Sequence, residues 1–422
     1  MNQKRTTKTG NYRWRILTLL FLATTINYID RQVIGILKPF IAEDLGWSEA
    51  DYGYIVTAFQ IAYAIGLVTT GRFLDKYGTR IGYLWAIIMW SIAGMAHAAA
   101  RGVASFVIVR FALGLGQSAN FPAAVKSVAE WFPKKERALA AGLFNSGSTI
   151  GAILAPIIVS GITLAMGWQW AFIITGALGF IWVVFWMNNY QPPGEHMKLS
   201  TQELEYINQD DEKLIEEKSI KWTDLFKYKQ TFAISLTRFL SDWVWWFFLF
   251  WIPDFLSKTH GTNIKEVVLP LIVIYSVSVV GGIGGGWISS WFIEKGKSID
   301  FARKTSILLC AIIVLPVMFV SQTQNLWLAV ILIAFAAAGH QGWASNIFTI
   351  VSDIYPKKAV GSMVGLSGFA GAVGGALSAT FVGLLLETTG SYFLIFLVAS
   401  SVYMINWIIL KLSIKKIVPI EV

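Results

Sequence analysis

The chain has 422 residues, of which 55% are hydrophobic and 14% are charged, and its mean hydropathy is +0.58. This composition excludes an ordinary soluble domain. The formal net charge of +9 does not indicate nucleic-acid binding either, because the basic residues are divided among short loops. Apolar runs of about 20 residues recur from end to end, and each is long enough to cross a bilayer as a helix. Backbone groups in lipid must satisfy one another, and the runs lack the short alternating segments of a membrane barrel. The sequence therefore predicts an all-α membrane protein.

Twelve membrane-spanning helices are expected. They cover about residues 14–38, 50–72, 80–99, 102–126, 137–161, 167–188, 230–257, 265–293, 303–321, 325–351, 359–385 and 389–412. The first is not a signal peptide, because its charged residues lie in mid-span and no small-residue cleavage site follows it.

The positive charge gathers on one side of the predicted membrane. The basic clusters are Lys4 to Arg15, Arg72 to Arg80, Lys134 to Arg137, Lys295 to Lys304, Lys357 with Lys358, and Lys411 to Lys416. With twelve spans, all of them fall on the side that holds both termini. The positive-inside rule then predicts that both termini are cytoplasmic. The single cysteine, Cys310, can form no disulfide within the chain.

A long polar stretch divides the chain into a first bundle (residues 1–188), a linker (189–229) and a second bundle (230–422). Ser200 stands three residues before Glu203, which is the spacing of a capping box and predicts a short amphipathic helix. A second short piece, with Trp222, Leu225 and Phe226 on one face, is suited to the membrane surface. We interpret the linker as a cytosolic tether, with a regulatory site as the alternative.

The two halves repeat each other. The segment "EWFPKKERALAAGL" begins at Glu130, and "DIYPKKAVGSMVGL" begins at Asp353, so the two align without gaps at an offset of 223 positions. Because each half has an even number of predicted spans, the repeats point the same way. This predicts two pseudo-symmetric six-helix bundles that enclose a central path.

The loop after the second span, "GRFLDKYGTR" from Gly71 to Arg80, combines close-packing glycines with mixed charges. Such a loop can pair charges across helix ends and release them when the bundles move. It resembles the signature of the major facilitator superfamily, which implies that fold and a gating role. The gating residues implied are Gly71, Arg72, Asp75 and Arg80.

Four further motifs narrow the resemblance, which covers essentially the whole chain. They are "NYIDR" at Asn27, "RFALGLGQSANFPAA" at Arg110, "EWFPKKERA" at Glu130 and "DWVWWFFLFWIP" at Asp242. Together they resemble the anion:cation symporter family, and within it the bacterial hexuronate transporters. The resemblance implies a monomeric, lipid-embedded carrier of the bacterial inner membrane, without a cofactor, that takes up glucuronate or galacturonate with protons. Another organic anion such as an aldonate is an alternative substrate, and a transporter-like sensor is an alternative function.

Asp30 and Arg31 lie side by side in the first predicted span. An ionisable residue deep in a span costs roughly 2.5–3.5 kcal/mol and is a functional-site hypothesis by default. The planar fork of arginine suits a carboxylate, and a buried aspartate suits a proton carrier. The resemblance implies that Asp30 is the proton-coupling acid and that Arg31 contacts the substrate carboxylate. The alternative is an ion pair that only pins the helix to its neighbours.

Arg110 and Gln117 form a second cluster in the fourth predicted span, and Arg110 lies at a depth comparable with that of Asp30. The family usually has a glutamate at the position of Gln117, as a second protonation site paired with the arginine one heptad earlier. Glutamine cannot release a proton, so coupling is expected to depend on Asp30. The substitution can be natural or engineered.

The remaining candidates could contact a sugar or pack helices. They are Tyr28, Tyr63, Ser148, Trp245, Trp246, His340, Gln341 and Asn346. Tyrosine hydroxyls could bond sugar hydroxyls, and tryptophan could stack on a sugar ring. Arg238 and Asp242, four residues apart, are expected to form an internal ion pair. No cluster has metal-ligand spacing and no nucleophile–base pair is evident, so an enzyme is not expected.

Overall fold

The computed structural model describes residues 10–210, 225–355 and 357–420, apart from the side chains of eleven residues within these ranges: 72, 75, 134, 135, 137–139, 210, 357, 358 and 361. Within these ranges the regular secondary structure is entirely helical. The first bundle contains α1 (Tyr12–Leu45), α2 (Glu49–Ala96), α3 (Val103–Gln117), α4 (Asn120–Trp131), α5 (Lys134–Met166) and α6 (Trp168–Asn189). The linker contains α7 (Thr201–Ile207). The second bundle contains α9 (Lys229–Phe250), α10 (Ile252–His260), α11 (Val268–Glu294), α12 (Ile299–Val314), α13 (Leu326–Ile354), α14 (Lys357–Thr389) and α15 (Phe393–Ser413).

These helices match the predicted spans closely. Two predicted spans merge into α2, which is interrupted where Gly78 adopts φ +76°, a conformation that favours glycine. The predicted spans 102–126 and 230–257 are each divided in two, as α3 with α4 and as α9 with α10. Ten helical segments in the described part of the chain are long and apolar enough to cross a membrane. Helices α1 and α9 are as long but more polar, since they carry the charged pairs Asp30–Arg31 and Arg238–Asp242.

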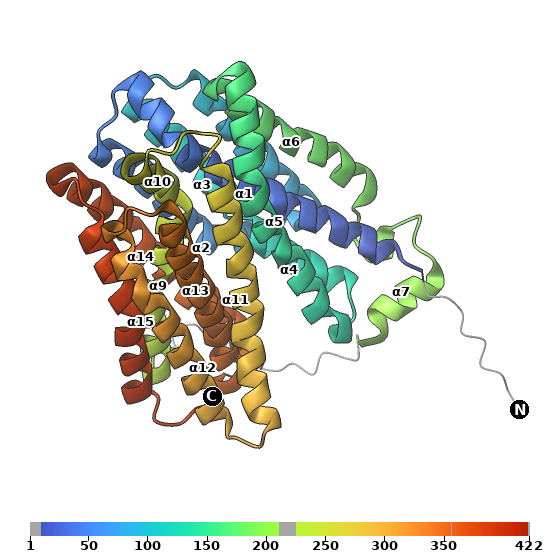
Figure 1. Ribbon diagram of the computed structural model, residues 1–422. Helices are drawn as coiled ribbons and strands as arrows, with labels where there is room; N and C mark the ends of the chain where they lie inside the picture. Colours follow the sequence, from blue (N-terminus) through green and yellow to red (C-terminus); the bar gives the residue numbers. More distant parts are fainter. Residues whose placement is uncertain (1–9, 211–224, 356, 421–422) are drawn as a thin grey trace, which may run out of the picture.

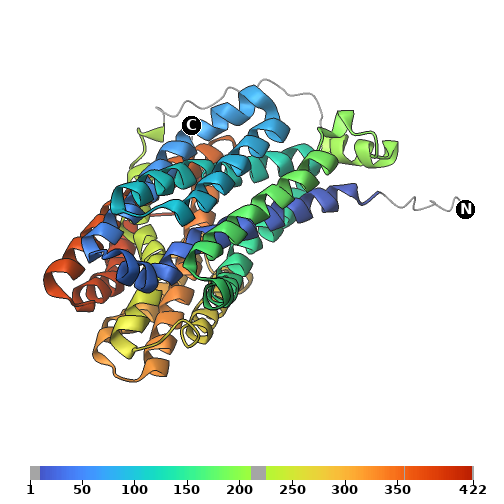
Figure 2. The ribbon, with the colours of Figure 1, turned by 90° about the horizontal axis from the view of Figure 1, so that it is seen from above.

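The two bundles lie side by side, with the first in blue to green and the second in yellow to red (Figures 1 and 2). Helix α1 begins and α15 ends at the same end of the molecule, which we call the terminal end. The opposite end, which we call the distal end, holds the turns that join α1 to α2 and α14 to α15. At the first of these turns Gly46 ends α1 at φ +68°, and Ser48 begins α2 in a complete capping box with Asp51.

Close contact between the bundles occurs where α2 meets α14. A Cβ atom at Gly53 would lie 3.0 Å from the carbonyl oxygen of Ala379, so glycine permits the close approach. One helical turn further along α2, the Thr57 hydroxyl lies 2.7 Å from that of Thr380. The two bundles therefore meet backbone to backbone in the distal half of the molecule.

The linker begins by packing against the first bundle. Ser200 caps α7 as predicted, accepting a hydrogen bond from the Glu203 N–H at 3.2 Å. The other half of the predicted capping box is wrong, because the Glu203 carboxylate accepts hydrogen bonds from the backbone N–H groups of Tyr12 and Arg13 at the start of α1, both at 3.1 Å. The Arg13 guanidinium joins Glu203 at 3.2 Å. Of the second predicted amphipathic piece, Trp222 lies outside the described residues.

Candidate functional site

Arg31 is 1% exposed and lies near the middle of α1. Its Nε donates to the Oε1 of Gln117 at 3.2 Å, and its Nη2 donates to the Oδ1 of Asn27 at 2.9 Å. Within the described residues no carboxylate lies close enough to form an ion pair with it. A guanidinium held by two neutral amides and without an acidic partner among the described residues can bind an incoming anion.

Aromatic rings from both bundles surround this guanidinium. Its central carbon lies 4.7 Å from the ring centroid of Tyr28, 4.9 Å from Tyr63, 5.2 Å from Trp246 and 5.3 Å from Phe59. Such faces attract a cation and exclude water. Trp246 belongs to α9 and the other rings to α1 and α2, so the cluster spans the boundary between the bundles. We call Arg31 and these four rings the arginine cage.

Asp30 points away from the arginine cage. It is 3% exposed, and its polar neighbours are Thr175 of α6 and Arg110 of α3. Neither carboxyl oxygen has a hydrogen-bond partner among the described residues. Arg110 donates to the backbone carbonyl of Arg31 at 2.8 Å, which confirms that α3 meets α1 at this depth. The side chains of Asp30 and Arg31 therefore contact different residues and do not form an ion pair.

The contacts of Gln117 differ from the family pattern. The resemblance pairs this position with Arg110 on the same helix, but in this chain Gln117 contacts α1. In addition to accepting from Arg31, Gln117 donates from Nε2 to the Asn27 carbonyl at 3.2 Å. Heptad spacing places two residues on one helical face, but the neighbouring helix here offers the better partners.

Trp245 and Trp246 are adjacent in sequence, but they have different surroundings. Only Trp246 reaches the arginine cage. Trp245 stacks on His340 at 5.5 Å between ring centroids, with an angle of 4° between the planes. The Nδ1 of His340 lies 2.6 Å from the hydroxyl of Tyr403. The contacts of Trp245 and His340 are thus internal to the second bundle, and a substrate contact by either residue stays a prediction.

Three other candidates also have local contacts. Asn346 donates to the carbonyls of Gly285 and Gly342, both at 2.9 Å, and so joins α13 to α11. Ser148 donates to the Asn145 carbonyl within α5 at 2.7 Å. The backbone carbonyl of Gln341 accepts from a serine one turn along α13. None of these hydrogen bonds reaches the arginine cage, and a substrate contact by these residues stays a prediction.

The predicted gating loop lies at the terminal end. The side chains of Arg72 and Asp75 lie outside the described residues, and Gly71 has open space beside its Cα. Arg80 donates to the Met187 carbonyl at 2.9 Å. In the second half, Arg303 stands at the position of Arg80 and pairs with Asp353 at 2.8 Å. The two halves therefore use equivalent positions with different partners.

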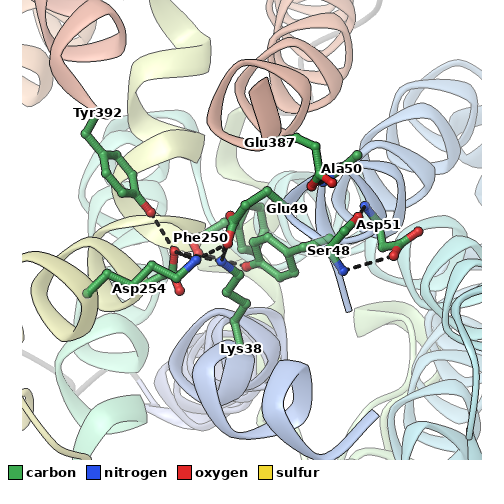
Figure 3. Close-up of polar contacts among 11 residues, drawn as sticks. Lys38, Ser48, Glu49, Ala50, Asp51, Phe250, Asp254, Glu387 and Tyr392 are labelled. Atoms are coloured by element: carbon green, nitrogen blue, oxygen red, sulfur yellow. Dashed lines mark hydrogen bonds and ion pairs between the residues drawn. The ribbon is translucent and has the colours of Figure 1, made fainter. Parts of the chain in front are cut away.

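A cluster of charged residues at the distal end was not predicted from the sequence. Lys38 of α1 contacts Glu49 of α2 and Asp254 of α10, each at 2.7 Å. Lys258 also contacts Glu49, and it lies 3.4 Å from Asp254. The hydroxyl of Tyr392 donates to Asp254 at 2.5 Å. We call Lys38, Glu49, Asp254 and Lys258 the distal ion cluster; its contacts join the two bundles (Figure 3).

A neighbouring contact strengthens this junction. Glu387 at the end of α14 accepts a hydrogen bond from the backbone N–H of Ala50 at 3.2 Å, and so caps the start of α2 across the bundle boundary (Figure 3). A carboxylate is favourable at a helix N-terminus. One sequence signal could have revealed the cluster: Lys38 is a cation that follows Arg31 by seven residues on the same face of an apolar helix. Among the described residues there is no group of acidic, histidine or cysteine side chains suited to a metal.

Comparisons with known proteins agree with this arrangement. The model of the Major Facilitator Superfamily matches residues 20–379. The chain is 32% identical over 390 residues to the hexuronate transporter of Escherichia coli K12, covering 91% of this chain and 90% of that protein. It is 31% identical to the D-galactonate transporter of Escherichia coli O6:H1, covering 91% of each chain. It is 29% identical to the probable galactarate/D-glucarate transporter of Bacillus subtilis, covering 97% and 94%.

A solved structure supports the fold. The bacterial homolog of the human lysosomal transporter Spinster superposes with a TM-score of 0.74 at 17% sequence identity, covering 96% of each chain. The family and these relatives are transporters and not enzymes. The helical architecture, the matched family model and the relatives lead to one assignment. This chain is a multi-pass membrane protein that belongs to the major facilitator superfamily.

Proposed function

We propose that this protein carries a hexuronate, glucuronate or galacturonate, into the cell together with a proton. The observation that carries the proposal is the buried Arg31 guanidinium, which has no acidic partner among the described residues and lies in a cage built from both bundles. A carboxylate can occupy the guanidinium fork, while the aromatic faces can pack against the C–H groups of a sugar. Relatives that carry hexuronate and galactonate support a sugar acid as the substrate.

Asp30 is the proposed carrier of the proton. Because neither of its oxygens has a hydrogen-bond partner among the described residues, taking up a proton breaks no such contact. A proton and a monoanion together carry no net charge, which lowers the cost of moving both through a low-dielectric interior. Arg110 links proton binding at Asp30 to substrate binding at Arg31, because it lies beside Asp30 and donates to the carbonyl of Arg31.

Alternating access follows from the position of the distal ion cluster. Its contacts join the bundles at one end of the path, so breaking them is required to open that end. Separation leaves each bundle with one cation and one anion, because Lys38 keeps Glu49 and Lys258 keeps Asp254. The cluster can therefore open without leaving an unpaired charge in either bundle.

The orientation is part of the proposal. The basic loops lie at the terminal end, so the positive-inside rule makes this end cytoplasmic. The distal ion cluster then faces the outside of the bacterial inner membrane. The carrier is proposed to work as a monomer surrounded by lipid, with the proton as its coupling ion and no cofactor.

Counterflow in proteoliposomes tests the carrier. Vesicles loaded with unlabelled galacturonate should accumulate external labelled galacturonate transiently, whereas a sensor would bind the label without exchanging it. Competition by glucuronate, galactonate and other organic acids identifies the substrate. If galactonate competes and neither uronate does, the protein carries aldonates and the hexuronate assignment is wrong.

Proton coupling is tested at position 117. Gln117→Glu should increase accumulation driven by a pH gradient much more than it changes substrate affinity, because it adds a proton-binding group beside Arg31. Wild type and variant are compared for the accumulation ratio and for galacturonate binding. Equal accumulation by both proteins would contradict a second protonation role for this position.

A further inference from the structure

An ion pair lies where α9, α13 and α14 meet. Arg238 donates to Asp242 from Nε at 2.9 Å and from Nη2 at 2.8 Å. Its Nη1 donates to Ser367 of α14 at 3.3 Å, and its guanidinium lies 5.0 Å from the ring centroid of Phe348 of α13. The predicted internal ion pair between Arg238 and Asp242 is confirmed. Its surroundings indicate more than a structural role.

The Arg238–Asp242 pair is only partly buried, as are several other side chains of α9. The side chains of Arg238 and Asp242 retain 16% and 19% of their exposure, whereas Thr237 and Ser241 beside them are fully buried. The partly exposed side of the pair is available to a ligand.

The pair also lies in line with the arginine cage. Asp242 and Trp246 are four residues apart and share one face of α9. Both face α14, where a Cβ at Gly371 would clash with the Asp242 carboxylate and a Cβ at Gly375 would lie 2.9 Å from the Trp246 ring. Since Trp246 contacts Arg31, Asp242 lies one turn beyond it towards the terminal end. A substrate held at Arg31 and extended along α9 would approach Asp242 and Arg238 with its far end.

The charges of the two bundles differ. The first bundle presents Arg31 and Arg110 with one carboxyl, Asp30, whereas in the second bundle Asp242 cancels Arg238. One substrate carboxylate can be held by Arg31. A second carboxylate at the far end of the ligand would meet a pair without net charge, whose partly exposed acid repels it.

We propose that the Arg238–Asp242 pair restricts the carrier to sugar acids with one carboxylate, and excludes aldarates, which carry a second carboxylate at the far end of the six-carbon chain. This inference rests on the proposed function and names its substrate class more narrowly. Hydroxyl groups at the far end can donate to Asp242 without breaking its contact with Arg238. Specificity of this kind comes from a charge that opposes the wrong ligand.

Two ligands of matched shape test the inference. Galactonate and galactarate differ only at the last carbon, which carries a hydroxyl in the first and a carboxylate in the second. Calorimetry on the purified wild-type protein should give at least tenfold weaker binding for galactarate. Asp242→Asn should reduce the ratio of galactonate affinity to galactarate affinity at least tenfold, because Arg238 is then free to bind the second carboxylate. Asp242→Ser, which places a smaller neutral side chain against Gly371, provides a second variant.

Two controls separate this effect from a general change in charge. Asp300→Asn removes an acid that pairs with Lys304 at 2.7 Å within α12, and it should leave the ligand ratio unchanged. Adding Arg238→Gln to Asp242→Asn should abolish the gain in galactarate binding, because the cation responsible is removed.

The binding results separate failure of the specificity inference from failure of the proposed function. Equal affinity of the wild-type protein for the two acids overturns the inference, as does an unchanged ratio in a folded variant that still binds galactonate. If the wild-type protein binds neither galactonate nor galacturonate and exchanges neither in counterflow, the proposed function is wrong and the inference is lost with it. Binding of the monoacids, together with a ratio of galactonate to galactarate affinity that does not depend on Asp242, refutes the inference alone.

Discussion

Replacing Lys38 by methionine should favour the state in which the distal end is open. Lys38 is 1% exposed and Asp254 is fully buried, and their contact at 2.7 Å crosses the bundle boundary. Opening breaks this contact but leaves Lys38 with Glu49 on its own bundle. Once exposed to water, that remaining pair contributes at most about 1 kcal/mol. The substitution therefore acts mainly on the closed state.

The size of the effect follows from what remains around Asp254. Removing one partner of a buried ion pair typically costs about 3–5 kcal/mol. The lower value applies here, because Lys258 lies 3.4 Å from Asp254 and the Tyr392 hydroxyl still donates to it. At 1.36 kcal/mol for each tenfold change, about 3 kcal/mol shifts the equilibrium between closed and open by about 150-fold.

Disulfide formation across the boundary measures this shift. The hydroxyls of Thr57 and Thr380 are 2.7 Å apart, so cysteines at both positions should cross-link readily in the closed state. Cys310, the only native cysteine, is first replaced by serine. Lys38→Met should slow cross-linking strongly.

The matched control is Lys304→Met, whose partner Asp300 lies on the same helix at 2.7 Å. It removes the same charge but no contact between the bundles, so the rate of cross-linking should not change. If Lys38→Met cross-links as fast as the unmodified pair, the distal ion cluster does not hold the bundles together.

Three further changes test the first bundle and the packing of the second. Asp30→Asn should abolish accumulation driven by a pH gradient while counterflow persists, and uphill accumulation by this variant would refute its role. Arg31→Lys keeps the charge but loses the fork held by two amides, so calorimetry should find binding weakened about 10- to 100-fold, from a loss of about 1.5–3 kcal/mol; unchanged affinity would contradict the carboxylate contact. Gly374→Ala should lower stability by about 1–3 kcal/mol because its Cβ would clash with the Phe239 carbonyl. Gly365→Ala, where nothing lies within 4 Å, should not destabilise the protein, and equal melting temperatures of the two variants would contradict the close approach.

The helices could be predicted from the sequence because lipid imposes a simple rule on them. An apolar run of sufficient length must be a helix, and the offset of 223 positions between the halves reveals the duplication. The sequence also showed that Asp30 and Arg31 point in different directions, because adjacent residues on a helix differ by about 100°. What it could not show is which neighbouring helix each side chain meets.

Three misses illustrate this limit. The family pattern pairs position 117 with Arg110 on the same helix, but the partners of Gln117 lie on α1. Trp245 and Trp246 looked equivalent in the sequence, yet helical rotation places only the second at the arginine cage. The contact between Lys38 and Asp254 forms only if the two bundles pack closely. That packing depends on small residues elsewhere in the sequence, such as Gly53.

Helix α1 connects the proposed substrate site to the distal ion cluster. Arg31 and Lys38 are seven residues apart on one face, about 10 Å along the axis. Between them, a Cβ at Gly35 would lie 2.9 Å from the Leu249 carbonyl, so α1 packs backbone to backbone against the end of α9. A movement of α1 that separates Lys38 from Asp254 must therefore also shift Arg31 against the Trp246 ring of the second bundle. Because coupling between two sites is reciprocal, a substrate that binds one state more tightly changes the strength of the distal contact by the same factor.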